Sequence, residues 1–244
     1  MNCGKLEAKM KKISFIGGYD KTDLVLYLAK ILVEMNNSVL LVDATILQRS
    51  RYIVPVIKEE NAYVTNFEGV DIAIGFNNFE EVKKGLGLPP SAPINYDYIF
   101  VDTDNQEGIL DFGIEQFDKN YFVTSFDVYS IKKGVEAVQV LANPIKATKV
   151  LFTQHLNKKD DEYLNYLMMG SKLEWEPEIV FFPFEVGDQT AIYMNQRVSK
   201  IKLEGLSSQY KEQLMYMAYQ ILQLDGKDQY NELRKVLKRV ERGV

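Results

Sequence analysis

Short apolar runs alternate with longer stretches of helical periodicity along most of this 244-residue chain. Such alternation is typical of a parallel sheet that is covered by helices on both faces. The sequence therefore predicts an α/β fold with a doubly wound, mainly parallel sheet. Strands are expected at Ile13–Ile16, Ser38–Val42, Val70–Ile74, Tyr98–Val101, Tyr121–Thr124, Lys149–Thr153 and Ile179–Phe182.

Helical segments fit between and after these strands. Apolar residues recur at helical spacing after the first strand, at Leu24, Leu28, Ile31 and Leu32. Asn36-Asn37 ends this helix with residues that tolerate the left-handed conformation, which completes a βαβ unit. The turn-forming residues of Leu86–Pro93 indicate a loop. A later helix is expected to place four residues on one face: Tyr210, Leu214, Met217 and Ile221.

Composition limits the classes of function. With 46% hydrophobic and 26% charged residues the chain is of ordinary soluble type. Its net charge of -5 gives no strong nucleic-acid signal. Cys3 is the only cysteine and His155 the only histidine, so a disulfide framework, a histidine-rich metal site and a Ser-His-Asp triad have almost nothing to use. We expect His155 on the surface or in a loop.

The expected organisation is one domain with two terminal additions. Residues 1–11 are predicted to be a mobile N-terminus, residues 12–226 the α/β domain, and residues 227–244 an amphipathic basic helix. Met1–Lys12 has no apolar signal core, and no stretch approaches the roughly 20 uncharged apolar residues of a spanning helix. The predicted location is the cytoplasm.

The segment Ile16–Asp23, IGGYDKTD, follows a predicted buried strand and opens a helix. That is the context of a phosphate-binding loop, in which glycines let backbone amides approach phosphate, a lysine neutralises charge and a hydroxyl ligates magnesium. The candidate nucleotide-binding residues are Gly17, Gly18, Lys21, Thr22 and Asp23. The alternative is that the loop no longer binds an anion and that these residues only support the turn.

Two acidic residues stand at ends of other predicted strands. Asp43 follows SVLLV and Asp102 follows YDYIFV. With Thr22 they form a candidate magnesium shell, because this cation prefers oxygen ligands. Simple strand-end residues that bond to the loop are the alternative.

These motifs together resemble the ParA/MinD family of deviant Walker A ATPases. KKISFIGGYDKT resembles the family's strand and KGGxGKT loop, VLLVDAT its second strand with a DxD switch, and YDYIFVDTD its Walker B strand. Later, KVLFTQH is similar to a family strand that ends in threonine, and VFFPFEVGDQTAIYMNQRV to its late strand, proline and following alanine. The resemblance spans most of the chain. It implies a P-loop NTPase fold, ATP with magnesium as cofactors, and a homodimer.

Several positions depart from the family pattern. The signature lysine, which in the family reaches across a dimer interface to the partner's nucleotide, falls on Ile16, and the glycine before the loop lysine is Asp20. The second aspartate of DxD, which orients the attacking water, falls on Thr45, and the usual proline of the Walker B turn is Asp104. Since catalysis would depend on these charges and this water, weak or absent ATPase activity is expected, with ATP and magnesium or no cofactor bound.

Asp20 is the most consequential departure. Two like charges about 4 Å apart repel by roughly 4 kcal/mol at an effective dielectric near 20, so a carboxylate here opposes phosphate binding. Aspartate is also a preferred helix cap, and its carboxylate suits the partial positive charge of a helix N-terminus. We hypothesise that Asp20 caps the following helix and competes with nucleotide.

The last predicted helix, from about Asp228, has one apolar and one basic face. The apolar face holds Leu233, Val236, Leu237 and Val240, and the basic residues include Arg234, Lys235, Lys238, Arg239 and Arg242. It resembles the membrane-surface helix at the C-terminus of MinD proteins, but lacks aromatic anchors. Packing on the domain or on a partner is the favoured alternative.

The functional hypothesis is a scaffold. It is a degenerate ParA/MinD-like protein that positions or recruits a cell-envelope, pilus, secretion or DNA-transfer machine, by analogy with the TadZ/CpaE group of pilus-localisation proteins. Its expected partners are a second copy of the chain, protein components of that machine and, through the C-terminal helix, the inner face of the membrane. The alternative is an active ATPase for plasmid or chromosome partitioning or division-site placement. A related tyrosine kinase would need a tyrosine-rich tail, which the final residues lack.

Overall fold

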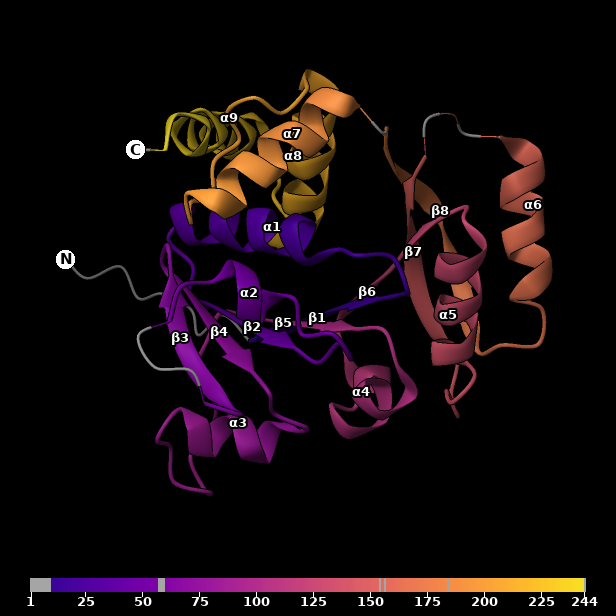
Figure 1. The fold of residues 1–244 in the computed structure, drawn as a ribbon, viewed down its shortest axis with the longest axis horizontal. Helices are drawn as coiled ribbons and strands as arrows, with labels where there is room; N and C mark the ends of the chain where they lie inside the picture. The colour runs from indigo at the N-terminus through magenta and orange to yellow at the C-terminus, as the bar shows by residue number, and fades with distance from the viewer. Residues whose placement is uncertain (1–9, 57–59, 154, 156, 184, 244) are drawn as a thin grey trace.

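A twisted sheet with helices on both faces makes up the protein (Figure 1). The computed structural model describes residues 10–56, 60–153, 155, 157–183 and 185–243. In these residues eight strands pair in the order β3-β4-β2-β5-β1-β6-β7-β8, and every pair is parallel except β3 with β4. The strands are β1 (Lys11–Ile16), β2 (Val39–Asp43), β3 (Tyr63–Phe67), β4 (Val70–Ile74), β5 (Tyr98–Thr103), β6 (Lys119–Ser125), β7 (Ile145–Phe152) and β8 (Leu173–Phe182).

The predicted doubly wound α/β fold is confirmed. All seven predicted strands form, and Val70–Ile74 has the predicted bounds. Strands β7 and β8 begin earlier than predicted, at Ile145 and Leu173, and Thr153 lies just after β7. Of the predicted mobile N-terminus, residues 1–9 lie outside the described residues, whereas Lys11 already belongs to β1.

Strand β3 was not predicted. It forms an antiparallel hairpin with β4 through Glu68 and Gly69, whose φ angles of 55° and 89° are both left-handed. Two such residues in succession give the tight turn that matches the twist of a hairpin. The strand YVTNF at the sheet edge buries its two aromatic ends, Tyr63 and Phe67, and leaves the three residues between them partly buried or exposed. Five residues without a regular polar and apolar alternation are a weak signal beside the long apolar runs of the central strands.

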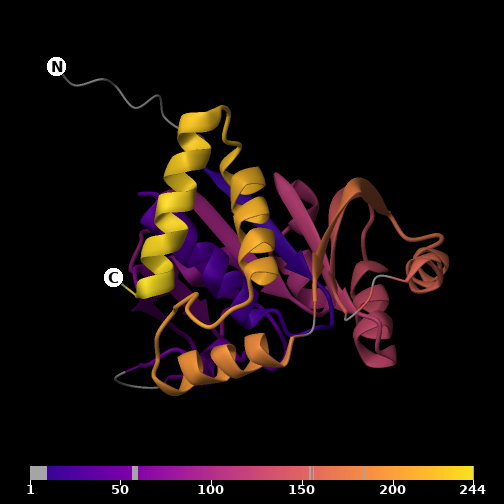
Figure 2. The ribbon, with the colours of Figure 1, turned by 90° about the horizontal axis from the view of Figure 1, so that it is seen from above.

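The helices lie in two layers (Figures 1 and 2). They are α1 (Thr22–Glu34), α2 (Ser50–Ile53), α3 (Phe79–Gly85), α4 (Gln106–Asp111), α5 (Val128–Val138), α6 (Lys158–Leu167), α7 (Val186–Arg197), α8 (Ser208–Leu222) and α9 (Lys227–Arg242), with a short 3₁₀ turn η1 (Ile114–Gln116). One core cluster joins one sheet face to α1, α8 and α9, and the other joins the opposite face to α3, α4, α5 and α6. Neighbouring strand residues point to opposite clusters, as Phe15 and Ile16 do.

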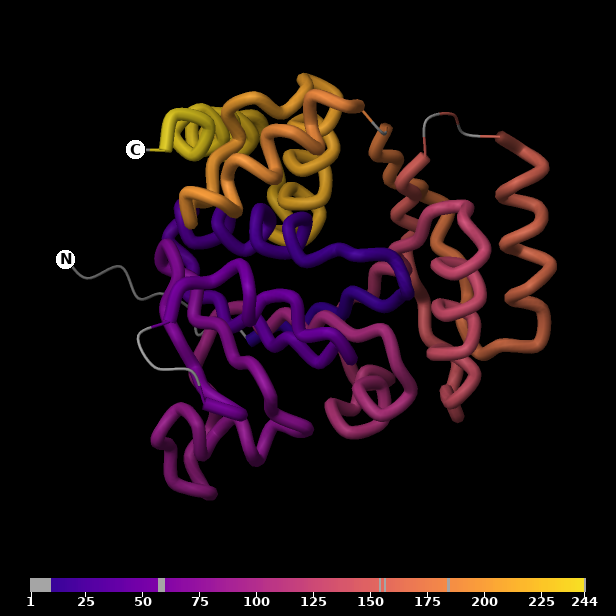
Figure 3. Tube along the Cα trace, viewed as in Figure 1, coloured from indigo at the N-terminus to yellow at the C-terminus, as the bar shows by residue number. Residues whose placement is uncertain are grey.

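Distant parts of the sequence meet in the first of these layers. The Cα trace shows α1, from the first seventh of the chain, beside the C-terminal helices (Figure 3). The four residues predicted on one face of α8 are all buried. Asn36 ends α1 with a left-handed φ of 62°, as expected for Asn36-Asn37. The loop at Leu86–Pro93 is confirmed, and His155 is exposed outside the helices and strands, also as predicted.

Candidate functional site

The predicted site residues converge at the carboxyl ends of the central strands. Asp43 at the end of β2 is directly opposite Asp102 near the end of β5, and β5 pairs in turn with β1, which leads into the loop. In parallel sheets this edge is where ligands bind. A cleft of about 290 Å³ opens here and is lined by Gly18, Lys21, Thr22 and Asp102 from the predicted set, with the altered positions Asp20 and Thr45.

Four residues that were singled out lie outside this cleft, and one of them, Gly17, packs against β6. Ile16, at the signature-lysine position, is completely buried in the core beneath the loop. Asp43 is buried just behind the cleft. Asp23 faces an adjoining cavity of about 270 Å³ between the start of α1 and α7.

Close packing explains the two loop glycines. Gly17 has φ 140°, and a Cβ there would lie 2.0 Å from the carbonyl oxygen of Val123 in β6. A Cβ on Gly18 would lie 2.6 Å from Cβ of Lys133 in α5. Both distances are far below van der Waals contact, so the loop can pass this close to β6 and α5 only without side chains. The role of both glycines in approaching phosphate stays a prediction.

Lys21 is turned into the protein. Its Nζ lies 2.7 Å from Asp102 Oδ1 and donates to the carbonyl oxygen of Gly17 at 2.9 Å. Burial raises the pKa of Asp102 to about 7; Lys21 opposes that shift and Asp43 adds to it. The loop lysine has an internal counter-ion in the place where a phosphate would otherwise provide one.

Asp20 occupies the start of α1. Its Oδ1 accepts from the backbone N–H of Thr22 at 3.2 Å and from the Thr22 hydroxyl at 2.9 Å, and its Oδ2 pairs with Arg49. The helix begins at Thr22 with Lys21 as the N-cap residue, so Asp20 precedes the cap by one position. The hypothesis that Asp20 is the cap residue is therefore wrong by one position, although its carboxylate does accept from a first-turn amide.

Asp43 and Thr45 organise the chain after β2. The Thr45 hydroxyl donates to Asp43 Oδ1 at 2.6 Å and accepts from the backbone N–H of Gln48 at 3.0 Å. Asp43 Oδ2 accepts from the backbone N–H of Ser50 at 3.0 Å. Asp104, at the usual proline position, accepts from the backbone N–H of Ile46 at 2.9 Å. These carboxylates hold one loop in place at the rim of the cleft.

The candidate magnesium ligands have suitable oxygen atoms, but each is engaged. The Thr22 hydroxyl bonds to Asp20, Asp43 accepts from three donors, and Asp102 pairs with Lys21. Within the described residues no three His, Cys, Asp or Glu side chains are grouped so as to hold a metal ion. This arrangement does not fit a magnesium ion held by the protein alone, and the magnesium shell remains a prediction tied to nucleotide.

Asp23 is half-buried beside the second cavity. Its Oδ2 accepts from Gln196 Nε2 of α7 at 2.8 Å. Burial raises the pKa of Asp23 to about 7, the nearby charge of Asp20 adds to the shift, and Gln196 opposes it. Tyr19 stacks on Phe152 with ring centroids 4.6 Å apart and helps to line this cavity. The two cavities share Tyr19, Asp20 and Arg49.

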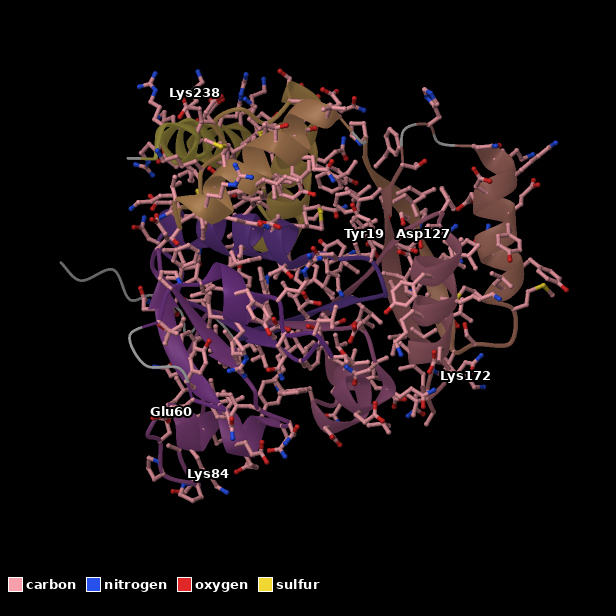
Figure 4. The ribbon with its side chains drawn as sticks, in the orientation of Figure 1. Tyr19, Glu60, Lys84, Asp127, Lys172 and Lys238 are labelled. Atoms are coloured by element: carbon pink, nitrogen blue, oxygen red, sulfur yellow. The ribbon has the colours of Figure 1, made fainter. Side chains whose placement is uncertain are left out.

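Six lining residues of the first cleft were not identified from the sequence. They are Tyr19, Leu47, Arg49, Asp127, Tyr129 and Ser130. Figure 4 labels Tyr19 and Asp127, which come from the β1–α1 loop and from the start of α5. Asp127 follows β6 and caps α5 by accepting from Ser130 N–H at 2.9 Å, so its place after an apolar run and three residues before serine was a usable signal.

Helix α9 buries part of its predicted apolar face. Leu233, Val236 and Val240 are buried in the core shared with α1 and α8, and Leu237 is partly buried. Lys235, Lys238 and Arg239 are exposed, and Lys238 lies on the outer side of the molecule (Figure 4). In the part of the chain that the structure covers, none of the helices is both long and apolar enough to cross a membrane.

Comparison with known proteins identifies the fold. Neither a protein-family model nor the sequence of a curated protein matches the chain. Solved structures do match over almost their whole length. A ParA family ATPase from Chlorobium tepidum is 14% identical with a TM-score of 0.55, covering 86% of this chain and 97% of its own.

Two further structures agree with the first. A Cyanothece McdA–ATP complex has a TM-score of 0.56 at 11% identity, covering 89% of this chain and 98% of its own. MinD of Aquifex aeolicus, solved with MinC, has a TM-score of 0.54 at 17% identity with the same coverage. At these identities the likeness establishes the ParA/MinD-type P-loop fold, as the sequence motifs predicted.

Proposed function

We propose that this chain, which has the ParA/MinD-type fold, is a nucleotide-binding scaffold with weak or no ATPase activity. One observation carries the proposal: the loop lysine and the loop hydroxyl already have protein partners, Lys21 with Asp102 and Thr22 with Asp20. A phosphate chain must displace the Asp20 carboxylate from the start of α1 before it can use the Thr22 donors, and it must compete with Asp102 for Lys21. Binding is therefore weakened without being abolished, since Gly18, Lys21 and Thr22 still line the cleft.

Slow hydrolysis follows from the position of Thr45. The family resemblance implies a water-orienting carboxylate there, whereas the Thr45 hydroxyl is bonded to Asp43 and to the Gln48 amide. A hydroxyl is a much poorer base than a carboxylate, and phosphoryl transfer depends on an oriented nucleophile and on positioned charge. Bound nucleotide would thus stabilise a conformation of the scaffold and would be hydrolysed only slowly. The ATP in the McdA complex supports nucleotide as the ligand class.

The first experiment is isothermal titration of the full chain with ATP and magnesium, beside a steady-state phosphate-release assay on the same sample. Binding without turnover is the expected result. Steady turnover would favour the alternative hypothesis, an active ATPase for partitioning or division-site placement. No binding would indicate that the protein acts only through contacts with other proteins. A parallel titration with a chelator in place of magnesium decides whether the Thr22, Asp43 and Asp102 shell takes part.

The cleft rim supports a second copy of the chain as a partner. Four apolar side chains are exposed around it: Ile46, Leu47, Val128 and Tyr129, between 60% and 67% exposed. Exposed apolar side chains gathered at one rim favour a protein contact. Sedimentation velocity with and without ATP should show a dimer that Leu47→Glu with Tyr129→Glu disrupts. A monomer under every condition would remove the homodimer.

The wider role is proposed by analogy. The chain would position or recruit a cell-envelope, pilus, secretion or DNA-transfer machine, as TadZ/CpaE proteins position pili. The MinC bound to Aquifex aeolicus MinD illustrates protein partnering by a protein of this fold. A fluorescent fusion in the native cell should form foci at the envelope, and uniform cytoplasmic fluorescence would argue against this role.

We assign α9 to the domain and not to the membrane. Its apolar residues Leu233, Val236 and Val240 already pack against the protein, which leaves mainly the basic side chains for any membrane contact. Co-sedimentation with anionic vesicles tests this by comparing the full chain with the double variant Lys235→Glu plus Lys238→Glu. Equal and low pelleting is expected. If the full chain pellets with the vesicles and the double variant does not, α9 would instead be a peripheral membrane-binding helix.

A further inference from the structure

We infer that Arg49 is a phosphate-binding residue of the cleft: when a nucleoside triphosphate binds, the Arg49 guanidinium leaves the Asp20 carboxylate and pairs with the terminal phosphate. The inference rests on the proposed nucleotide-binding function and deepens it. In this chain Lys21 is already paired with Asp102, and Ile16 carries no charge. Arg49 would supply the positive charge that the bound phosphate needs.

Arg49 is the accessible cation of the site. Among the described residues that line the two cavities, Lys21 and Arg49 are the only cationic side chains. The Lys21 side chain is 1% exposed and held by Asp102, whereas the Arg49 side chain is 52% exposed. Arg49 lines both cavities and can therefore reach a ligand that extends from one to the other.

The present partner of Arg49 already resembles a phosphate. The Asp20 carboxylate accepts from the Thr22 backbone amide, from the Thr22 hydroxyl and from Arg49. A helix N-terminus, a hydroxyl and a guanidinium are the donors that phosphate oxygens use in proteins. An incoming phosphate would replace the Asp20 carboxylate as the acceptor for the donors of Thr22 and Arg49. The flat guanidinium fork suits phosphate at least as well as it suits a carboxylate.

The backbone on both sides of Arg49 is fixed. Gln48 N–H donates to the Thr45 hydroxyl at 3.0 Å, and Ser50 N–H donates to Asp43 Oδ2 at 3.0 Å. The exchange therefore needs a swing of the Arg49 side chain and no movement of the loop. It also gives Thr45 a positioning role: at this altered position a hydroxyl anchors the turn that presents Arg49.

Charge balance in the cleft favours a second cation from the protein. Asp20, Asp102, Asp104 and Asp127 line the phosphate cleft opposite only Lys21 and Arg49. A triphosphate adds further negative charge, and repulsion between like charges a few ångströms apart amounts to kilocalories per mole. Lys21 is already paired with Asp102. Among the described lining residues, Arg49 is the cation that remains for the terminal phosphate.

A double-mutant cycle separates contact with phosphate from simple neutralisation of Asp20. Full-length wild type, Asp20→Asn, Arg49→Gln and the double variant are titrated with a non-hydrolysable ATP analogue and with ADP. Arg197→Gln, which removes one positive charge from an exposed position that lines neither cavity, is the matched control. Thermal unfolding of each variant checks that it is folded.

The Asp20→Asn background decides the result. There Arg49→Gln should weaken the ATP analogue by about tenfold or more and ADP by clearly less, because only the analogue has the terminal phosphate. Equal affinity of Asp20→Asn and the double variant would overturn the inference while leaving nucleotide binding intact, since Arg49 would then only neutralise Asp20. Failure of every variant to bind either nucleotide would overturn the proposed function and the inference with it.

Discussion

Lys21 Nζ lies 2.7 Å from Asp102 Oδ1, and the two side chains are only 1% and 4% exposed. The pair joins the phosphate-loop lysine to the end of β5 across the base of the cleft. A buried pair of this kind is costly to break, because removing one partner leaves the other charge without a counter-ion in a poorly solvated place.

Replacing Lys21 with methionine should therefore destabilise the protein in a pH-dependent way. The expected loss is about 3 to 5 kcal/mol at about pH 8, where Asp102 is charged. The loss should shrink near pH 5.5, because the pKa of Asp102 is raised to about 7 even beside Lys21 and rises further without it. Urea unfolding at both pH values measures this. Lys21→Met with Asp102→Asn should recover part of the loss, and an equal loss at both pH values would contradict the argument.

Replacing Asp20 with glycine should improve nucleotide affinity. An unscreened carboxylate about 4 Å from phosphate would cost roughly 4 kcal/mol, or several hundredfold, but Arg49 offsets part of that charge, so a gain of about tenfold is expected. Loss of the hydrogen bonds to Thr22 should lower stability by about 1 kcal/mol. Titration with ATP beside Asp225→Gly, a remote exposed control, tests both points. Unchanged or weaker binding would reject the competition hypothesis.

Replacing Gly17 with alanine should destabilise the fold by several kcal/mol, because the new Cβ would meet the Val123 carbonyl at 2.0 Å with φ at 140°. The matched control is Gly187→Ala in α7, where a Cβ would have nothing within 4 Å. That variant should be as stable as wild type or up to about 1 kcal/mol more stable. Chemical denaturation compares the two. Similar behaviour of both variants would show that the loop can move away from β6.

The central strands were predictable because their apolar runs are continuous, and the loop because its residues stand between a strand and a helix. The convergence of Asp43 and Asp102 followed from strand order, since the ends of parallel strands share one edge. Strand β3 was missed because a short edge strand with one polar residue on each face carries little periodic signal.

The contacts within the site were much less predictable. Asp20 and Arg49 are 29 residues apart, and nothing local links them. The orientation of Lys21 depends on how far Asp102 is buried, which is a property of the assembled sheet. Asp23 was grouped with the phosphate-binding residues by adjacency, yet its position on α1 turns it toward α7 and Gln196. Sequence order places the elements, whereas side-chain pairing depends on their packing.

Replacing Leu233 with alanine should show that α9 belongs to the core. Leu233 is fully buried, so the substitution should cost about 2 to 5 kcal/mol through lost burial and the cavity that it leaves. Leu110→Ala in α4 is the control, because Leu110 is 56% exposed and its truncation should cost less than about 0.5 kcal/mol. Urea unfolding measures both. Equal small effects would indicate that α9 is detached in solution.

Asp23 should make stability depend on pH in a direction opposite to that of a salt-bridged carboxylate. Its pKa in the folded protein is raised to about 7 from 3.8, so the folded state binds this proton more tightly than the unfolded state does. Between about pH 4 and pH 7 the unfolded state therefore holds fewer protons at this site, and the free energy of unfolding falls as pH rises. A difference of about 3 pH units corresponds to at most about 4 kcal/mol.

Asp23→Asn should remove this contribution, because the amide cannot ionise and can still bond to Gln196. Asp102 contributes a slope of the same sign, so the comparison is between the slopes of the variant and the wild type. The variant should lose less stability than wild type between about pH 4 and pH 7, and the two curves should run parallel above about pH 8. Asp160→Asn, at a partly exposed position in the first turn of α6, controls for the loss of one carboxylate. Parallel curves for Asp23→Asn and wild type over the whole range would show that Asp23 titrates at its ordinary value and is accessible to solvent through the second cavity.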